Sequence, residues 1–180
     1  MGCSSDSTTE HRGNYNRSSI MEGNIPISSG AKIDLEQFRK RALQKHNELR
    51  KKHGAPDLTL NENLNKMAQD YAEKLLNYEG QKVFPFNIYE DSLLGENISI
   101  SKKEDPEQIC MKWYNESKKY NFDLNKHQKD TIHFTQIVWK ATKQIGFGFY
   151  FNNDNFSSVA LYYPCGNVLG KFSENVQKSN

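Results

Sequence analysis

A single histidine, His133, begins the stretch "HFTQIVW" that ends at Trp139, in a chain with five histidines. An imidazole in this position can bind a metal, act as a general base, or pack with its ring nitrogens hydrogen-bonded to neighbours. The neighbouring residues in the sequence do not show which of these three roles His133 has. The sequence has no G-x-S-x-G nucleophile motif and no H-E-x-x-H metal motif, so neither a nucleophile nor a metal-binding histidine pair is evident.

The three cysteines, Cys3, Cys110 and Cys165, are odd in number and widely separated. This spacing matches neither a disulfide framework nor a metal knuckle, and it favours a reducing compartment. No apolar run is long enough to span a bilayer, and the first thirty residues lack the apolar stretch of a signal peptide. We therefore expect a cytoplasmic protein that does not follow the classical secretory route.

The chain opens on a pattern for lipid modification, "MGCSSD". Once Met1 is removed, Gly2 is the acceptor for N-myristoylation, and the adjacent Cys3 is placed for palmitoylation. Asp6 departs from the pattern, because serine or threonine is preferred there. The alternative is a polar N-terminus that carries no lipid.

Composition indicates one soluble domain with a tail. Of the 180 residues, 36% are hydrophobic and 26% are charged, and the net charge of +2 is too small to indicate nucleic-acid binding. We expect a flexible N-terminal tail over residues 1–30, one folded domain over residues 31–176 and a C-terminal tail over residues 177–180.

The first predicted helix lies in "DLEQFRKRALQKHNELRKKHGAP", with Asp34 as its cap and Gly54 and Pro56 at its end. Its apolar face comprises Leu35, Phe38, Ala42, His46 and Leu49, so we interpret His46 as a hydrogen-bonded core histidine. The basic residues of one flank either face solvent or contact anionic lipid headgroups: Arg41, Lys45 and Lys52.

Further elements follow along the chain. A second helix is expected from Asn61, then a long loop over residues 77–94, a strand at "GENISIS" and a helix capped by Asp105 that includes Glu116. A short helical turn over residues 133–139 and a hairpin around "NNDN" complete the series. This order predicts an α+β fold, with helices on both faces of a mainly antiparallel sheet.

Five motifs, in order over residues 34–176, resemble the CAP (SCP/TAPS) superfamily, which includes the venom allergen-like proteins. They are "HNELRKKHGAPDLTLNENLNKMAQDYAEKL", "GENIS", "WYNESKKYNF", "HFTQIVWKAT" and "YYPCGNV". The chain is most similar to the intracellular, Golgi-associated plant pathogenesis-related branch. This resemblance implies a three-layer α-β-α sandwich, myristoylation, peripheral attachment to membranes, binding of anionic lipids and dimerisation.

The resemblance also implies a cleft lined by two histidines and two glutamates. Glu96, Glu116 and His133 match three of these positions, whereas the second histidine is replaced near Phe84. One imidazole and two carboxylates can still hold a divalent metal weakly with water completing the shell, although no cofactor is required. The alternative is a hydrogen-bonded polar cluster without metal.

The expected function is that of a non-enzymatic protein at the Golgi or plasma membrane, which binds anionic phospholipid or sterol and has protein partners. The candidate lipid or sterol loop, whose alternative role is local packing, comprises Val83, Phe84, Phe86, Ile88 and Tyr89. Two other functions remain open: a metal-assisted hydrolase with His133 and Glu96 or Glu116 as general base, and a dimeric module that binds a peptide.

Overall fold

A four-stranded sheet forms the middle of the molecule. The structure is a computed structural model, and it describes residues 25–26, 32–77, 88–102, 105–152 and 155–179. The strands follow the order β3 (Thr59–Leu60), β7 (Gln144–Asn152), β8 (Asn155–Tyr163) and β6 (Gly95–Lys102). β3 runs parallel to β7, and the other neighbouring strands are antiparallel. The predicted hairpin is therefore confirmed as β7 and β8.

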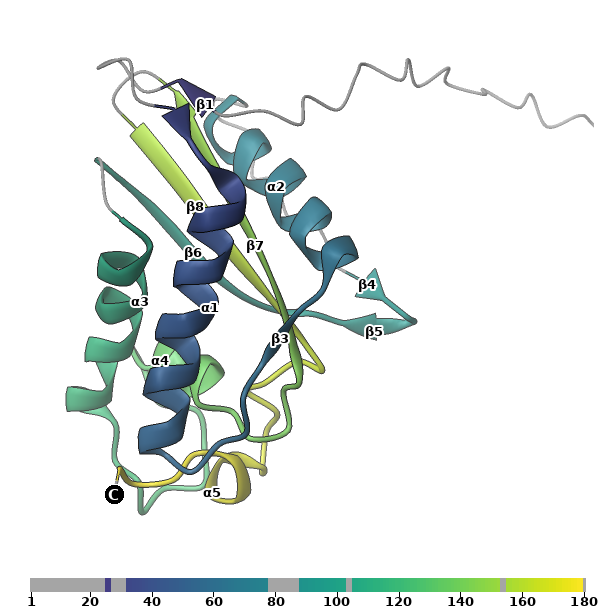
Figure 1. Cartoon of the computed structure of the whole chain (residues 1–180). Coiled ribbons are helices and arrows are strands. Elements are labelled where there is room, and N and C mark those ends of the chain that lie inside the picture. The colour runs from purple at the N-terminus through teal and green to yellow at the C-terminus, as the bar shows by residue number, and fades with distance from the viewer. Residues whose placement is uncertain (1–24, 27–31, 78–87, 103–104, 153–154, 180) are drawn as a thin grey trace, which may run out of the picture.

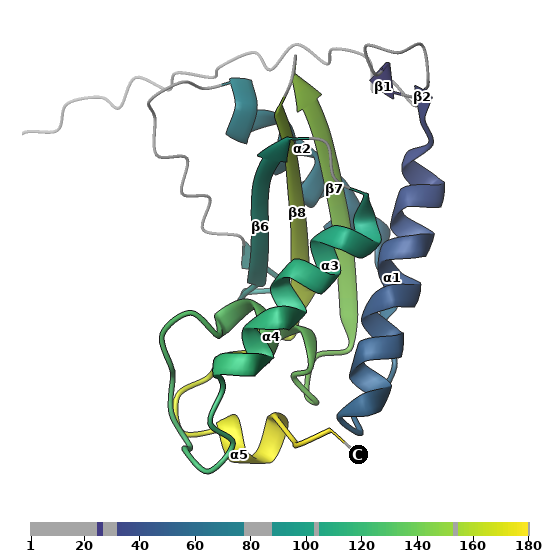
Figure 2. The same cartoon turned by 90° about the vertical axis from the view of Figure 1, so that its left-hand side faces the viewer.

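Helices cover both faces of this sheet. α1 (Leu35–Lys52) and α3 (Pro106–Tyr114) lie on one face, and α2 (Glu62–Asn77) lies on the other (Figures 1 and 2). The arrangement is the predicted α-β-α sandwich.

The predicted helix caps are present. The Asp34 carboxylate accepts hydrogen bonds from the backbone amides of Glu36 and Gln37. Asp105 and Gln108 form a capping box at the start of α3. At the other end of α1, Gly54 has a φ of +60°, the left-handed conformation that stops a helix at little cost when the residue is glycine.

The core is divided by the alternation of side chains along β8. Val159 and Leu161 pack beneath α2, whereas Ala160 and Tyr162 belong to the larger core under α1 and α3. On β7, a Cβ atom at Gly148 would overlap the backbone of Ala68. The absence of that atom lets α2 lie directly against the sheet.

Shorter elements complete the fold. β1 (Ile25–Pro26) pairs with β2 (Lys32–Ile33), so an ordered strand pair crosses the expected start of the domain. β4 (Ile88–Tyr89) and β5 (Ser92–Leu93) form a small hairpin inside the predicted long loop, and it projects from the body of the molecule (Figure 1). The remaining helices are η1 (Asn115–Lys119), α4 (Ile132–Ile137) and α5 (Phe172–Asn175).

Arg50, on the inner face of α1, joins this helix to the segment between α4 and β7. Its guanidinium donates to the carbonyls of Pro56 at 2.7 Å, Ile137 at 2.7 Å, Trp139 at 2.9 Å and Thr142 at 3.0 Å. The side chain is fully buried. Burial lowers the pKa of Arg50 to about 10, so the group is still charged at neutral pH.

Candidate functional site

Glu116 and His133 meet between η1 and the start of α4. The carboxylate accepts hydrogen bonds from His133 Nδ1 at 2.6 Å and from the backbone amides of His133 at 2.9 Å and Phe134 at 3.1 Å. Thr131 makes no side-chain capping bond to this helix. Glu116 therefore caps α4 from a distant part of the chain. It lies in η1, beyond the end of α3, and not in the same helix as Trp113 as the sequence predicted.

The contacts favour the ionised form of the Glu116 carboxyl. Burial alone would raise the pKa of the Glu116 carboxyl, but the hydrogen bonds from the His133 ring and from two amides outweigh it and lower that pKa below its ordinary value. Because an ionised carboxylate only accepts hydrogen bonds, His133 Nδ1 carries a proton in this contact. The ring stacks on Trp113 with centroids 6.1 Å apart, and its side chain is 29% exposed. The pair is thus a partly exposed, hydrogen-bonded polar cluster.

Glu96 lies on the opposite face of the sheet from this pair. The next residue, Asn97, donates to the His133 carbonyl, so its side chain points toward α4. Successive side chains of a strand point to opposite faces, and Leu161, opposite Glu96 in the register, packs beneath α2. Burial and the charge of Glu96 raise the pKa of Tyr71, on α2, to about 12, which also places Glu96 on that side.

The donor set near His133 is small for a metal. Both oxygens of Glu116 already accept hydrogen bonds, and the Glu96 side chain points to the opposite face of the sheet. Among the residues that the structure describes, no group of three or more His, Cys, Asp or Glu side chains is arranged to hold a metal ion. The Phe84 position, where the second histidine was expected, lies outside the described residues. Zinc in proteins is bound by three or four protein ligands, and His133 alone supplies one.

His46 is the buried core histidine that the helical pattern predicted. Its Nδ1 donates to the Ala42 carbonyl at 2.9 Å, and its Nε2 accepts from the Tyr162 hydroxyl at 2.9 Å. Tyr162 in turn accepts from Asn97 at 3.0 Å, which links α1 through β8 to β6. Cys110 lies beside the ring, with Sγ 3.3 Å from Nδ1, and burial raises the pKa of its thiol. A neutral, buried thiol is a poor nucleophile.

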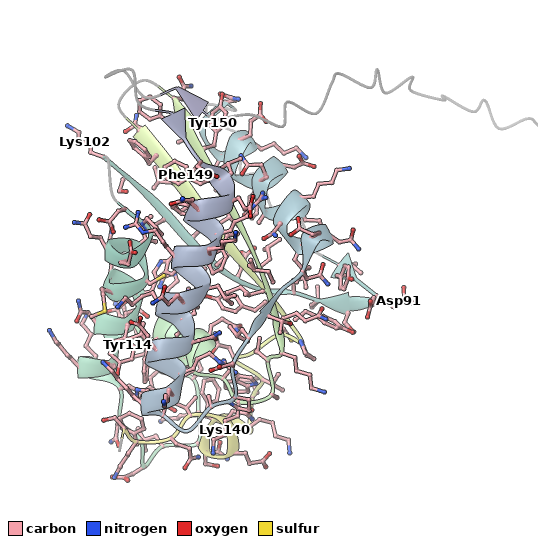
Figure 3. The ribbon with its side chains drawn as sticks, in the orientation of Figure 1. Asp91, Lys102, Tyr114, Lys140, Phe149 and Tyr150 are labelled. Carbon is pink, nitrogen blue, oxygen red and sulfur yellow. The ribbon has the colours of Figure 1, made fainter. Side chains whose placement is uncertain are left out.

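The candidate lipid-contacting residues fall into different environments. Ile88 is 57% exposed, whereas Tyr89 packs edge-on against Tyr163 and accepts a hydrogen bond from Asn61. Val83, Phe84, Phe86 and the acyl acceptors Gly2 and Cys3 lie outside the described residues. Asp91 stands at the tip of the hairpin (Figure 3), and this negative charge disfavours insertion of the tip into an anionic membrane.

The basic flank of α1 is partly neutralised. Arg41 forms a two-pronged ion pair with Glu107 of α3, and Lys45 Nζ lies 2.5 Å from Glu48 Oε2. Lys52 differs, since its Nζ lies 5.9 Å from the centre of the Tyr114 ring and the residue is exposed. Of the three predicted headgroup contacts, Lys52 is therefore the one most available to an anion.

Two buried residues at this end of α1 were missed by the sequence analysis. Arg50 and His53 follow His46 by four and seven positions, which places them on the same buried stripe. The spacing would have found them if polar side chains had been counted with the apolar ones.

Replacing Glu116 with alanine should lower the free energy of unfolding at about pH 7 by about 1–2 kcal/mol, because two amides of α4 and the His133 ring lose their acceptor. A folded-state pKa below the unfolded value means that this stabilisation is present above the ordinary carboxyl pKa and is lost as the pH falls through the folded value. Urea unfolding at about pH 7 and about pH 3 should show the difference between the proteins shrinking in acid. The matched control is Glu73→Ala on the exposed side of α2, and an equal effect in both variants would rule out the capping role.

Comparison with known proteins decides the family. The family model described as the cysteine-rich secretory protein family, CAP, matches residues 43–166. Golgi-associated plant pathogenesis-related protein 1 of Homo sapiens is 41% identical over 145 residues, which cover 78% of this chain and 93% of that protein. The chain belongs to the CAP family. A second relative, GLIPR1-like protein 1 of Mus musculus, is 35% identical over 71% of this chain and 60% of its own length.

Solved structures show the same CAP fold. Venom allergen-like protein 4 of Schistosoma mansoni superposes with a TM-score of 0.64 at 23% identity, covering 80% of this chain and 96% of that one. The structure of NaASP2 with Zn²⁺ gives a TM-score of 0.61 at 23% identity, covering 81% of this chain and 87% of that one. At this level of identity the likeness concerns the fold. Within the described part of this CAP protein, no helix has the length and apolar character needed to cross a membrane.

Proposed function

We propose that this CAP-family protein works without catalysis as a peripheral membrane protein, attached through acyl chains on Gly2 and Cys3. The observation that carries the proposal is the 41% identity, over 93% of its length, to a relative whose name places it at the Golgi. The acyl acceptors supply a physical means of attachment. One myristoyl chain binds a bilayer with an association constant of only about 10⁴ M⁻¹, so a second chain makes attachment durable.

The site chemistry favours binding over catalysis. The Glu116 carboxylate is committed to capping α4, so it is a poor candidate for a general base. The Cys110 thiol, beside His46 in the core, is buried and has a raised pKa. The proposed ligands are therefore membrane lipids, anionic phospholipid or sterol, with a protein partner or a second copy of the chain as a further contact.

The attachment is tested by the Gly2→Ala variant, produced in cells that myristoylate proteins. The fraction of protein that sediments with membranes should fall at least about tenfold, because palmitoylation of Cys3 depends on prior delivery to the membrane by the first chain. Cys3→Ser should show an intermediate loss. Mass spectrometry of the N-terminus gives the modification directly.

The matched control is Gly13→Ala, the same substitution elsewhere in the N-terminal segment. It should sediment like the wild type. If Gly2→Ala and the wild type sediment equally, the protein does not use this anchor.

A further inference from the structure

A cavity of about 460 Å³ lies at the end of the sandwich where the C-terminus of α1 meets α5. Its lining includes Phe122, Ser173 and two lysines, Lys140 and Lys178. Figure 3 shows Lys140 beside α5 at this end of the molecule. The volume falls within the range of about 300–1,000 Å³ that is usual for small-molecule sites.

Hydrogen bonds between distant segments build the walls of this cavity. The Lys140 amide donates to the Asn175 carbonyl at 3.2 Å, which fixes the backbone that carries the lysine. His53, another lining residue, donates from its ring Nδ1 to the Gln177 carbonyl at 2.6 Å. The Ser173 amide donates to Asn125 Oδ1 at 3.0 Å. These hydrogen bonds hold the backbone segments around the cavity in place, so the fold itself forms the cavity.

Among the described residues, the lining includes two lysines and no carboxylate side chain. Within the described part of the chain, Lys140 Nζ has no ion-pair partner, and Lys178 Nζ is 3.3 Å from Asp123 in a pair whose two side chains are largely exposed. Such an exposed pair contributes little free energy, so Lys178 can turn to a better anion at small cost. The His53 ring is a wall and not a ligand, because its Nε2 is already bonded to the Tyr114 hydroxyl at 2.9 Å.

We propose that this cavity binds a small molecule bearing a phosphate group, held by Lys140 and Lys178, with the rest of the molecule against the Phe122 ring. Two ammonium groups suit a doubly charged anion, and lysine is a common phosphate ligand. Ser173, which also lines the cavity, has a hydroxyl that can donate a further hydrogen bond. No residue of the Glu116 and His133 pair lines this cavity, so the two sites are separate.

The phosphate group can belong to a soluble metabolite or to a lipid headgroup. Binding of the soluble form is independent of the proposed membrane function, whereas the headgroup form rests on it. Full-length protein that carries no acyl chain separates the two questions, since its binding to the cavity does not depend on Gly2 or Cys3.

The test is isothermal titration of this protein with glycerol 3-phosphate at low ionic strength, with glycerol as the uncharged comparison. Lys140→Glu should weaken the affinity about tenfold or more, the loss expected for one charged hydrogen bond. Lys66→Glu, on the exposed side of α2, makes the same change in net charge away from the cavity and should alter the affinity less than about twofold. Amide NMR shifts should concentrate at residues 173–177.

A second arm uses vesicles of phosphatidic acid in phosphatidylcholine. If glycerol 3-phosphate displaces the protein from these vesicles, the headgroup is the source of the phosphate; if vesicle binding is unaffected, the cavity serves a soluble compound. The proposal fails if wild-type protein does not bind glycerol 3-phosphate, or if Lys140→Glu and Lys66→Glu weaken binding equally. Neither failure bears on the Gly2→Ala result.

Discussion

Replacing Arg50 with methionine should lower the free energy of unfolding by about 3–5 kcal/mol. The substitution keeps much of the buried volume but removes the guanidinium donors to the carbonyls of Pro56, Ile137, Trp139 and Thr142. The Trp139 carbonyl would still accept from the Thr142 amide at 3.2 Å, whereas the carbonyls of Pro56, Ile137 and Thr142 would lose their Arg50 bonds without a replacement. Urea unfolding followed by tryptophan fluorescence is suitable, because the two tryptophans, Trp113 and Trp139, are both buried in the native state.

Two variants sharpen this prediction. Arg50→Lys keeps the charge but cannot place donors at four carbonyls, so it should recover less than half of the loss. Arg41→Met removes an exposed arginine and its ion pair with Glu107, and it should cost less than about 1 kcal/mol. Equal effects of Arg50→Met and Arg41→Met would show that the buried network contributes little.

Stability should fall by up to about 3 kcal/mol as the pH is lowered from about 6.5 to about 4, because of His46. Burial lowers the pKa of His46 from 6.5 to about 4 in the folded protein. Between these values the unfolded chain binds a proton that the folded chain excludes, so acid favours unfolding. The contribution is fully present above pH 6.5 and is lost as the pH falls to the folded value.

His46→Gln should flatten this part of the curve of unfolding free energy against pH, whatever its effect on stability at neutral pH. His127→Gln, a change at an exposed histidine, is the matched control. The lowered pKa of His53 acts in the same direction, so a smaller slope should remain in the His46 variant. An NMR signal of His46 that titrates near pH 6.5 in the folded protein would contradict the prediction.

Local chemistry made much of the fold predictable from the sequence. The helix caps Asp34 and Asp105 and the apolar spacing of α1 and α2 involve residues within one or two helical turns of each other. These helices could therefore be predicted from short stretches of the sequence. The alternation in "GENISIS" likewise predicted β6, and the hairpin of β7 and β8 followed from its turn residues.

The site was less predictable, because its contacts join distant segments. Glu116 reaches across 17 and 18 residues to the amides of His133 and Phe134, and no local pattern distinguishes such a cap from a metal ligand. Arg41 pairs with Glu107, which lies 66 residues further along the chain. The charges on one flank of α1 could not predict this ion pair. The side chain of Glu96 points to the face of the sheet away from His133. Predicting this required the register of β6 against β8, which the sequence does not show.

The buried polar residues of α1 also govern when the chain can fold during its synthesis. Three of the four acceptors of Arg50 lie 87 to 92 residues further along the chain, and the carbonyl that accepts from His53 lies 124 residues beyond that histidine. The first helix therefore leaves the ribosome long before its partners do. Its inner face stays solvated until the last strands and the final residues emerge, so the domain acquires its stability late and as one cooperative unit. Ribosomes arrested before Gln177 should consequently carry a nascent chain that proteases still cut within α1.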